Sequence, residues 1–149
     1  MSDSGNFDNQ VRLFVYRFFL DEGRPPVPAE ITRGVGRPQS EVEASLKRLA
    51  EAHVLVLAPG TPYIWMANPL SALPTPFWVQ TGDRVWFGNC IWDALGIVAM
   101  LATDADVRSW CPDCGKDMVL SVRDGSISGS GIIHFAVPAA HWWDDIGFN

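Results

Sequence analysis

The feature that most constrains the fold is an almost wholly apolar segment at residues 90–101, CIWDALGIVAML. Because nearly every position is apolar, the segment predicts a helix that lies at the centre of the molecule rather than on its surface. We expect Asn89 to cap this helix. The chain has no apolar run of the roughly 18 residues that would indicate a membrane-spanning helix.

Short strand patterns surround this helix and predict a mixed α/β core at residues 77–149. Residues 77–79 and 84–87 are typical of strands around a Gly82-Asp83 turn, and residues 107–110 lead into a later Cys-x-x-Cys. Further strands are expected at 118–122, 127–128 and 132–137, joined by Gly/Ser turns. No closing helix follows the aromatic, acidic run at 141–145, so we expect the core to be cut short at its C-terminal end.

The N-terminal part predicts three helices and a β-hairpin. Apolar residues at helical spacing favour a helix at 10–20, and a second is expected at 28–33. Ser40 and Glu43 predict a capping box for a third helix at 41–52. Strands at 54–57 and 63–66 would flank a Pro59-Gly60 turn. The prediction is an α+β protein with a winged-helix-like domain at 8–68, a proline-containing linker at 69–76 and the core at 77–149.

The third helix of a winged-helix domain reads DNA in proteins that bind it. Here that helix carries Glu41, Glu43 and Glu51 against Lys47 and Arg48, and the chain has a net charge of −6. Acidic residues would face phosphates unfavourably, so nucleic acid is not the expected partner. DNA binding and a structural or lid role both remain open for this domain.

The bulk composition indicates a globular protein in a reducing compartment. The 149 residues are 48% hydrophobic and 19% charged, and the first ten residues lack the pattern of a secretory signal. The three cysteines are an odd number, and two of them form a Cys-x-x-Cys. We therefore expect a cytoplasmic protein that uses cysteine for metal binding or chemistry rather than for disulfides, and no membrane partner.

Cys90 and Asp93 lie one helical turn apart at the start of the apolar segment. A helix N-terminus stabilises a thiolate, so we expect a lowered pKa for Cys90. Burial disfavours a charged carboxylate, so we expect a raised pKa and a protonated acid at Asp93. In a second interpretation, Asp93 binds backbone N–H groups at the helix start. The two interpretations are compatible.

Cys111 and Cys114 form a tight thiol pair that could bind metal. A structural zinc site needs four ligands, and the other candidates are Cys90, His53, His134, His141 and the acids. Structural zinc, a redox pair, and a soft-metal or structural thiol role remain open.

Seven tryptophans are many for this length, and six follow residue 77. They indicate either a bulky aromatic core or the walls of an apolar pocket around the cysteines.

Residues 86–96 (WFGNCIWDALG), 106–111 (DVRSWC) and 119–122 (VLSV) carry a family resemblance. They resemble the core of organomercurial (alkylmercury) lyases, which have a winged-helix-like region ahead of a compact α/β core. The resemblance covers roughly residues 10–149 and is most specific from Cys90 to Cys111.

The resemblance implies a role for each matching residue. Cys90 would take the organomercurial, Asp93 would carry the proton, and Cys111 would be largely structural. The family's second mercury-binding cysteine falls at or just beyond Asn149, where this chain has none. Cys114 has no family counterpart and is a candidate substitute, so the expected metal ligands are Cys90, Cys111 and Cys114.

The function implied is protonolysis of a carbon–mercury bond, with thiolate binding weakening that bond and Asp93 acting as general acid. Mercury is the substrate, so no cofactor is required, and small or protein thiols would accept the Hg²⁺ product. Two alternatives remain: a metal-responsive regulator or soft-metal-binding protein without turnover, and a lyase-like enzyme acting on another organic substrate. The sequence makes no prediction of oligomeric state.

Overall fold

The N-terminal helices pack around one apolar stripe. In the computed structural model, which describes residues 3–147, helix α1 (Asp3–Glu22) buries residues spaced four apart: Phe7, Val11, Val15 and Phe19. This spacing keeps them on one face, which packs on α2 (Pro28–Val35) and α3 (Gln39–Glu51). The helix expected at 10–20 is longer than predicted because Phe7 extends the stripe by another turn.

Helix α3 begins earlier than expected, and the predicted capping box is wrong. The carbonyl of Pro38 accepts the backbone N–H groups of Glu41 (3.0 Å) and Val42 (3.2 Å), and no side chain caps the helix. Ser40 therefore lies inside the first turn. Glu43 instead accepts a 2.7 Å hydrogen bond from the side chain of Gln39. The helix starts directly after the proline, whose fixed φ suits the position before a helix.

The predicted hairpin is confirmed and is extended by a third strand. Strands β1 (Val56–Leu57), β2 (Ile64–Ala67) and β3 (Leu70–Ser71) form an antiparallel sheet in that order. Strand β3 lies inside the segment expected to be a linker, and Leu70 also forms a bridge to Gly88. This bridge connects the small sheet to the end of a strand in the larger one.

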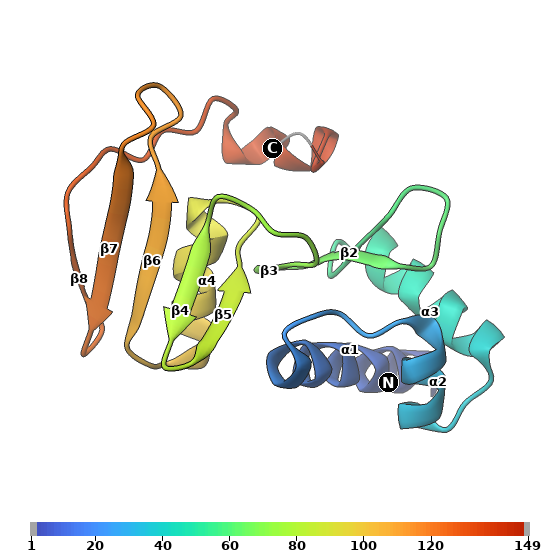
Figure 1. The fold of residues 1–149 in the computed structure, drawn as a ribbon. Helices are drawn as coiled ribbons and strands as arrows, with labels where there is room; N and C mark the ends of the chain where they lie inside the picture. Colours follow the sequence, from blue (N-terminus) through green and yellow to red (C-terminus); the bar gives the residue numbers. More distant parts are fainter. Residues whose placement is uncertain (1–2, 148–149) are drawn as a thin grey trace.

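The larger sheet has five antiparallel strands in the order β5-β4-β6-β7-β8 (Figure 1). Its strands are β4 (Trp78–Thr81), β5 (Arg84–Phe87), β6 (Ala105–Trp110), β7 (Asp117–Arg123) and β8 (Ser126–Ser128). The strands expected at 77–79, 84–87, 118–122 and 127–128 are thus confirmed to within a few residues. The strand expected at 132–137 is wrong, because this segment has no regular structure. It is followed by a 3₁₀ helix, η1 (Ala139–Asp144).

Helix α4 (Ile91–Leu101) lies against one face of the larger sheet (Figure 1). It buries Ala94, Ile97 and Val98, and it contacts β3, β4 and β6. Its opposite face is exposed, with Trp92 64% accessible. The apolar segment at 90–101 is therefore buried along one face only. Its N-cap is Cys90 rather than Asn89.

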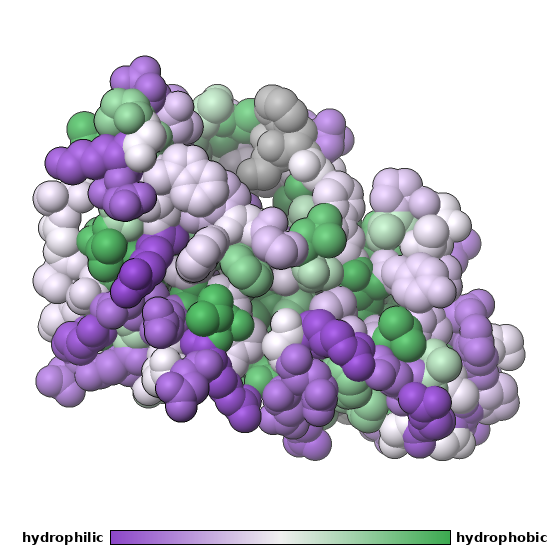
Figure 2. Space-filling model, viewed as in Figure 1, coloured by the Kyte–Doolittle hydropathy of each residue, from purple (hydrophilic) through white to green (hydrophobic). Residues whose placement is uncertain are grey.

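The buried residues of the helices and of the larger sheet form one connected cluster, from Phe7 to Val122. The division into two domains at residues 69–76 stays a prediction. On the face seen in Figure 2, hydrophobic residues are scattered across the middle and hydrophilic residues follow the lower edge. Scattered apolar residues of this kind are ordinary on a protein surface. Among residues 3–147, no helix is both long and apolar enough to cross a membrane.

Candidate active site

A pocket of about 220 Å³ forms where the start of α4 meets β2 and the C-terminal segment. Cys90 and Asp93 line it on one side. The other lining residues come from segments far apart in sequence: Met66, Asn68, Asn89, Trp92, Phe135, Trp142, Trp143 and Ile146. The prediction that several tryptophans wall a pocket around a cysteine is confirmed for Cys90.

The start of α4 is fixed by a close backbone contact. A Cβ atom added to Gly88 would lie 2.5 Å from the backbone nitrogen of Ala94, so only glycine fits there. This contact holds the end of β5 against the first turn of the helix. Since Cys90 and Asp93 both lie in the short segment between Gly88 and Ala94, the contact also restricts their positions.

Cys90 and Asp93 are in direct contact. The Cys90 thiol donates to Oδ2 of Asp93 across 3.5 Å, and both residues are partly buried. Burial raises the pKa of the Cys90 thiol to about 11, and the nearby Asp93 charge adds to the increase. The expected lowering of the Cys90 pKa is therefore wrong. Loss of hydration outweighs the stabilisation that the helix N-terminus gives to a thiolate, so the sulfur carries its proton at neutral pH.

Asp93 is held by several donors at the helix start. Burial raises the pKa of this carboxyl group, as expected, while hydrogen bonds from Asn89 and Cys90, including their backbone N–H groups, act in the opposite direction. Asp93 therefore binds backbone N–H groups, as the second interpretation expects. It also contacts Cys90, which is a protonated thiol rather than the expected thiolate, and the proton-donor role of Asp93 stays a prediction. The carboxylate oxygen is positioned to take the thiol proton.

Two asparagines that the sequence did not single out as site residues connect this carboxyl group to the N-terminal helices. The Asn89 amide donates to Oδ1 of Asn68 (3.2 Å), and Tyr16 donates to the Asn68 carbonyl oxygen (2.7 Å). The Oδ1 atom of Asn89 is buried and has no hydrogen-bond partner among the described residues. Nothing in the local sequence indicates this network, because its members lie on α1, after β2 and before α4.

Aromatic residues of the C-terminal segment cover the pocket. Phe135 packs on Trp142, with ring centroids 5.2 Å apart, and the Trp142 indole donates to the Val137 carbonyl (2.9 Å). Trp143 stacks on His53. Phe135 and Ile146 could not be predicted as lining residues, because their position depends on how an irregular segment crosses the helix.

The other expected metal ligands lie elsewhere. Cys111 and Cys114 sit in the turn between β6 and β7 and do not line the Cys90 pocket. His134 lines a separate apolar hollow, and His141 pairs with Asp144 at 3.0 Å. Among residues 3–147, no three His, Cys, Asp or Glu side chains are grouped to hold a metal. Asn149, which falls at the family's second cysteine position, lies outside the described residues.

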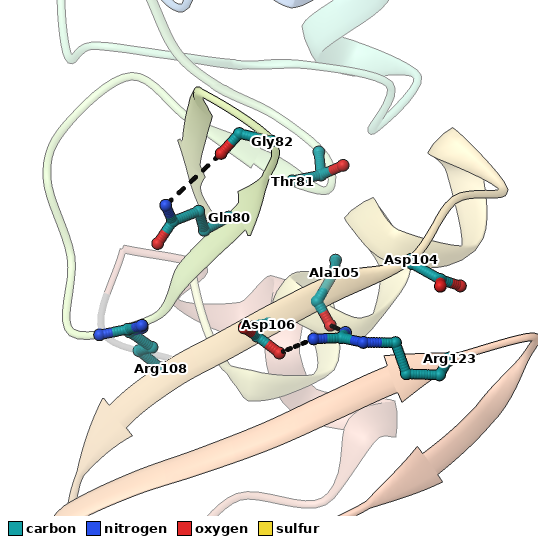
Figure 3. Close-up of a pocket in the computed structure, with 8 residues that line it drawn as sticks. All are labelled: Gln80, Thr81, Gly82, Asp104, Ala105, Asp106, Arg108 and Arg123. Carbon is teal, nitrogen blue, oxygen red and sulfur yellow. Dashed lines mark hydrogen bonds and ion pairs between the residues drawn. The ribbon is translucent and has the colours of Figure 1, made fainter.

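A second hollow of about 340 Å³ lies near the β4–β5 turn and is polar (Figure 3). Arg123 crosses it to donate to Asp106 and to the Ala105 carbonyl, each at 2.7 Å. Asp106 also accepts a hydrogen bond from Ser121 (2.8 Å). Arg123 and Asp106 are thus engaged with one another, and neither Cys90 nor Asp93 lines this hollow.

Two arginines on or beside the helix that would read DNA are paired with acidic residues, while Lys47 is exposed. Arg48 donates to both carboxylate oxygens of Asp8 on α1 (2.9 and 2.6 Å), and Arg37, just before α3, pairs with Glu41 (3.7 Å). Glu51 stays exposed on the same helix, and Glu43 is partly exposed. The arrangement favours the structural role of α3 over phosphate binding.

The sequence matches a known family over the segment that builds this site. The family described as alkylmercury lyase matches residues 70–148, more than half of the chain, and the chain therefore belongs to that family. The mercury-bound form of MerB2 has a similar fold, with a TM-score of 0.62 and 23% identity. That match covers 80% of this chain and 58% of the other, so the chain spans little more than half the length of that protein. No curated protein sequence matches significantly.

Proposed function

We propose that the protein cleaves carbon–mercury bonds by protonolysis, with Cys90 as the mercury-binding thiol and Asp93 as the proton carrier. The observation that carries the proposal is the 3.5 Å contact between Cys90 Sγ and Asp93 Oδ2 inside an aromatic pocket. Membership of the alkylmercury lyase family supports it.

The reaction begins with a proton transfer from sulfur to carboxylate. The raised pKa of Cys90 means that the thiol is protonated before substrate arrives. As sulfur bonds to the mercury of R–Hg⁺, the S–H proton moves to Asp93, which burial already favours in its acid form. The products of this step are a Cys90–S–Hg–R adduct and a neutral Asp93.

The second step returns that proton to carbon. The carbon–mercury bond breaks with its electron pair on carbon, and the neutral Asp93 donates its proton there, releasing R–H. Mercury stays on Cys90 as a thiolate complex, and Asp93 is again a carboxylate. A small or protein thiol then removes the Hg²⁺, because no other cysteine of the described residues lines this pocket.

The pocket walls suit the organic part of such a substrate. Trp92, Trp142 and Phe135 present apolar surface, and about 220 Å³ accommodates a small alkyl or aryl group. An apolar wall also excludes water from the breaking bond, which leaves Asp93 as the available proton donor.

One observation favours soft-metal binding without turnover as a second candidate. A single thiol lines the pocket among the described residues, so mercury would gain only one protein sulfur and less activation of its bond to carbon. In that case the protein would hold organomercurials as a binder or regulator.

Incubation with a phenylmercury salt and excess small thiol separates the two functions. The proposal expects a phenylmercury adduct on Cys90, located by peptide mass, and benzene in the headspace. Cys90→Ala should abolish benzene release and leave phenylmercury adducts only on Cys111 or Cys114. An adduct without benzene would establish the binder. Absence of both with the unaltered chain would exclude both functions.

A further inference from the structure

The turn between β6 and β7 carries a pair of thiols that the proposed reaction does not use. The Cys111 N–H donates to the Lys116 carbonyl, and the Gly115 N–H donates to the Cys111 carbonyl, each across 2.8 Å. Gly115 has a φ of 70°, which favours glycine and lets the chain reverse within the turn. The result is a tight, hydrogen-bonded knuckle with Cys111 and Cys114 on it.

The two cysteines lie three residues apart on this one tight turn. Hydrogen bonds from the backbone N–H groups of Cys114 and Asp113, and from the Cys114 side chain, lower the pKa of Cys111. Backbone donors aimed at sulfur stabilise negative charge on it, as they do in metal-binding knuckles. The donors are held by the turn itself, so the arrangement is formed before any ligand binds.

The pair is open to solvent. Cys114 is exposed and Cys111 is partly exposed. A Cβ added to Gly115 would meet nothing within 4 Å, so none of the described residues packs against the turn at that point. The thiols contribute little to the core, and the sulfurs have room to separate as an ion enters between them.

We propose that Cys111 and Cys114 form a second metal site, separate from the Cys90 pocket, which binds one Hg²⁺ ion through two thiolates. Binding forms two S–Hg bonds and releases the two thiol protons. Mercury(II) is satisfied by two sulfur ligands in a linear arrangement, whereas structural zinc requires four ligands. Residues 3–147 offer no group of three ligands, so this site selects a thiophilic ion that needs only two.

The site has a use if the proposed function is correct, since Hg²⁺ is the product of that reaction. A surface dithiol would compete with single thiols for the ion, because both sulfurs hold it at once. This role as product acceptor rests on the proposed function. Binding of Hg²⁺ at the knuckle does not, and it can be measured without any organomercurial.

The test uses the full chain with Cys90→Ala, so that only the knuckle thiols remain. The protein is treated with Hg²⁺, washed with an excess of a small monothiol, and examined by native mass spectrometry. We expect one Hg²⁺ retained per chain. With Cys111→Ser or Cys114→Ser added, retention should fall at least tenfold, because a single thiolate exchanges with the monothiol. Zn²⁺ in place of Hg²⁺ should not be retained.

A second measurement avoids the serine variants. In the Cys90→Ala chain, bound Hg²⁺ should protect both Cys111 and Cys114 from alkylation, as mapped by peptide mass. The proposal is wrong if no mercury is retained, if retention survives both serine substitutions, if Zn²⁺ is retained equally, or if one ion bridges two chains. A loss of benzene release in Cys90→Ala bears on the proposed function alone and leaves this result unaffected.

Discussion

The imidazole of His53 lies flat on the indole of Trp143, with ring centroids 3.9 Å apart and planes 6° apart. His53 follows α3, whereas Trp143 lines the Cys90 pocket. Gly147 of the C-terminal segment also lies close to the Trp65 ring on β2, because a Cβ built on this glycine would be 3.0 Å from that ring. The N-terminal helices and hairpin thus help to hold the aromatic wall of the pocket.

Removing the His53 ring should loosen that wall. His53 has a φ of 58°, and Asn tolerates this conformation, so His53→Asn removes the stack with little backbone strain. A stacked pair contributes about 1 kcal/mol, which corresponds to a roughly fivefold shift towards an open pocket. We expect Cys90 to be alkylated by a bulky aromatic maleimide about fivefold faster. Trp143→Leu, which removes the other ring of the stack, is the matched comparison. An unchanged alkylation rate would mean that the stack does not control access to Cys90.

Gly88→Ala should displace the start of α4. The added methyl group would lie 2.5 Å from the Ala94 nitrogen, and backbone atoms cannot move aside as a flexible side chain can. Overpacking of this kind costs roughly 1–3 kcal/mol. We expect a lower melting temperature and a larger loss of benzene release than of phenylmercury binding, because the contact between Cys90 and Asp93 is disturbed. Gly125→Ala, in the open β7–β8 turn, is the control for strain without a clash.

The raised pKa of Cys90 predicts its reactivity towards iodoacetamide. Burial holds this pKa at about 11, so the thiolate fraction, and with it the alkylation rate, should keep rising above pH 9. Hydrogen bonds from the backbone lower the pKa of Cys111, which should therefore react fully at a lower pH. Peptide mapping distinguishes the two residues. A plateau for Cys90 below pH 8 would contradict the burial argument.

Asp8 should contribute to the pH dependence of the free energy of unfolding. Hydrogen bonds from Arg48 and Ser45 lower the pKa of Asp8 in the folded state. Its stabilisation is therefore present above the unfolded pKa and is lost as the pH falls through the folded value. Because Arg48 is 42% exposed, we expect Asp8→Asn to lower the free energy of unfolding by only about 1 kcal/mol at pH 7. Urea titrations should show the difference shrinking towards pH 2; a constant difference would point to packing instead.

The spacing of apolar residues and the turn residues predicted the elements that depend on residues close together in the sequence. The apolar spacing from Val11 to Phe19 predicted α1, and the turn at Pro59-Gly60 predicted the hairpin. The segment 132–137 has equally strong β-forming residues but no strand, because strand propensity is realised only where a neighbouring strand pairs with it. Here the segment leads Phe135 across to the Cys90 pocket instead.

In the candidate site, too, the sequence predicts contacts between nearby residues but not those that depend on distant segments. Cys90 and Asp93 are one helical turn apart, so their contact could be predicted from sequence alone. The pKa of Cys90 could not, because it depends on burial by residues that arrive from β2 and from the C-terminal segment. Backbone hydrogen bonds at the start of α4 do lower the pKa of Cys90, but the loss of hydration raises it by more.

The most direct test of the proton-carrier role is a single-turnover measurement on Asp93→Asn. The amide keeps the shape of the carboxyl group but cannot take the thiol proton and return it to carbon. After loading with phenylmercury, mass spectrometry should show the Cys90 adduct, while benzene release should fall by roughly 10²-fold or more. Benzene released at the rate of the unaltered protein would show that Asp93 does not carry the proton.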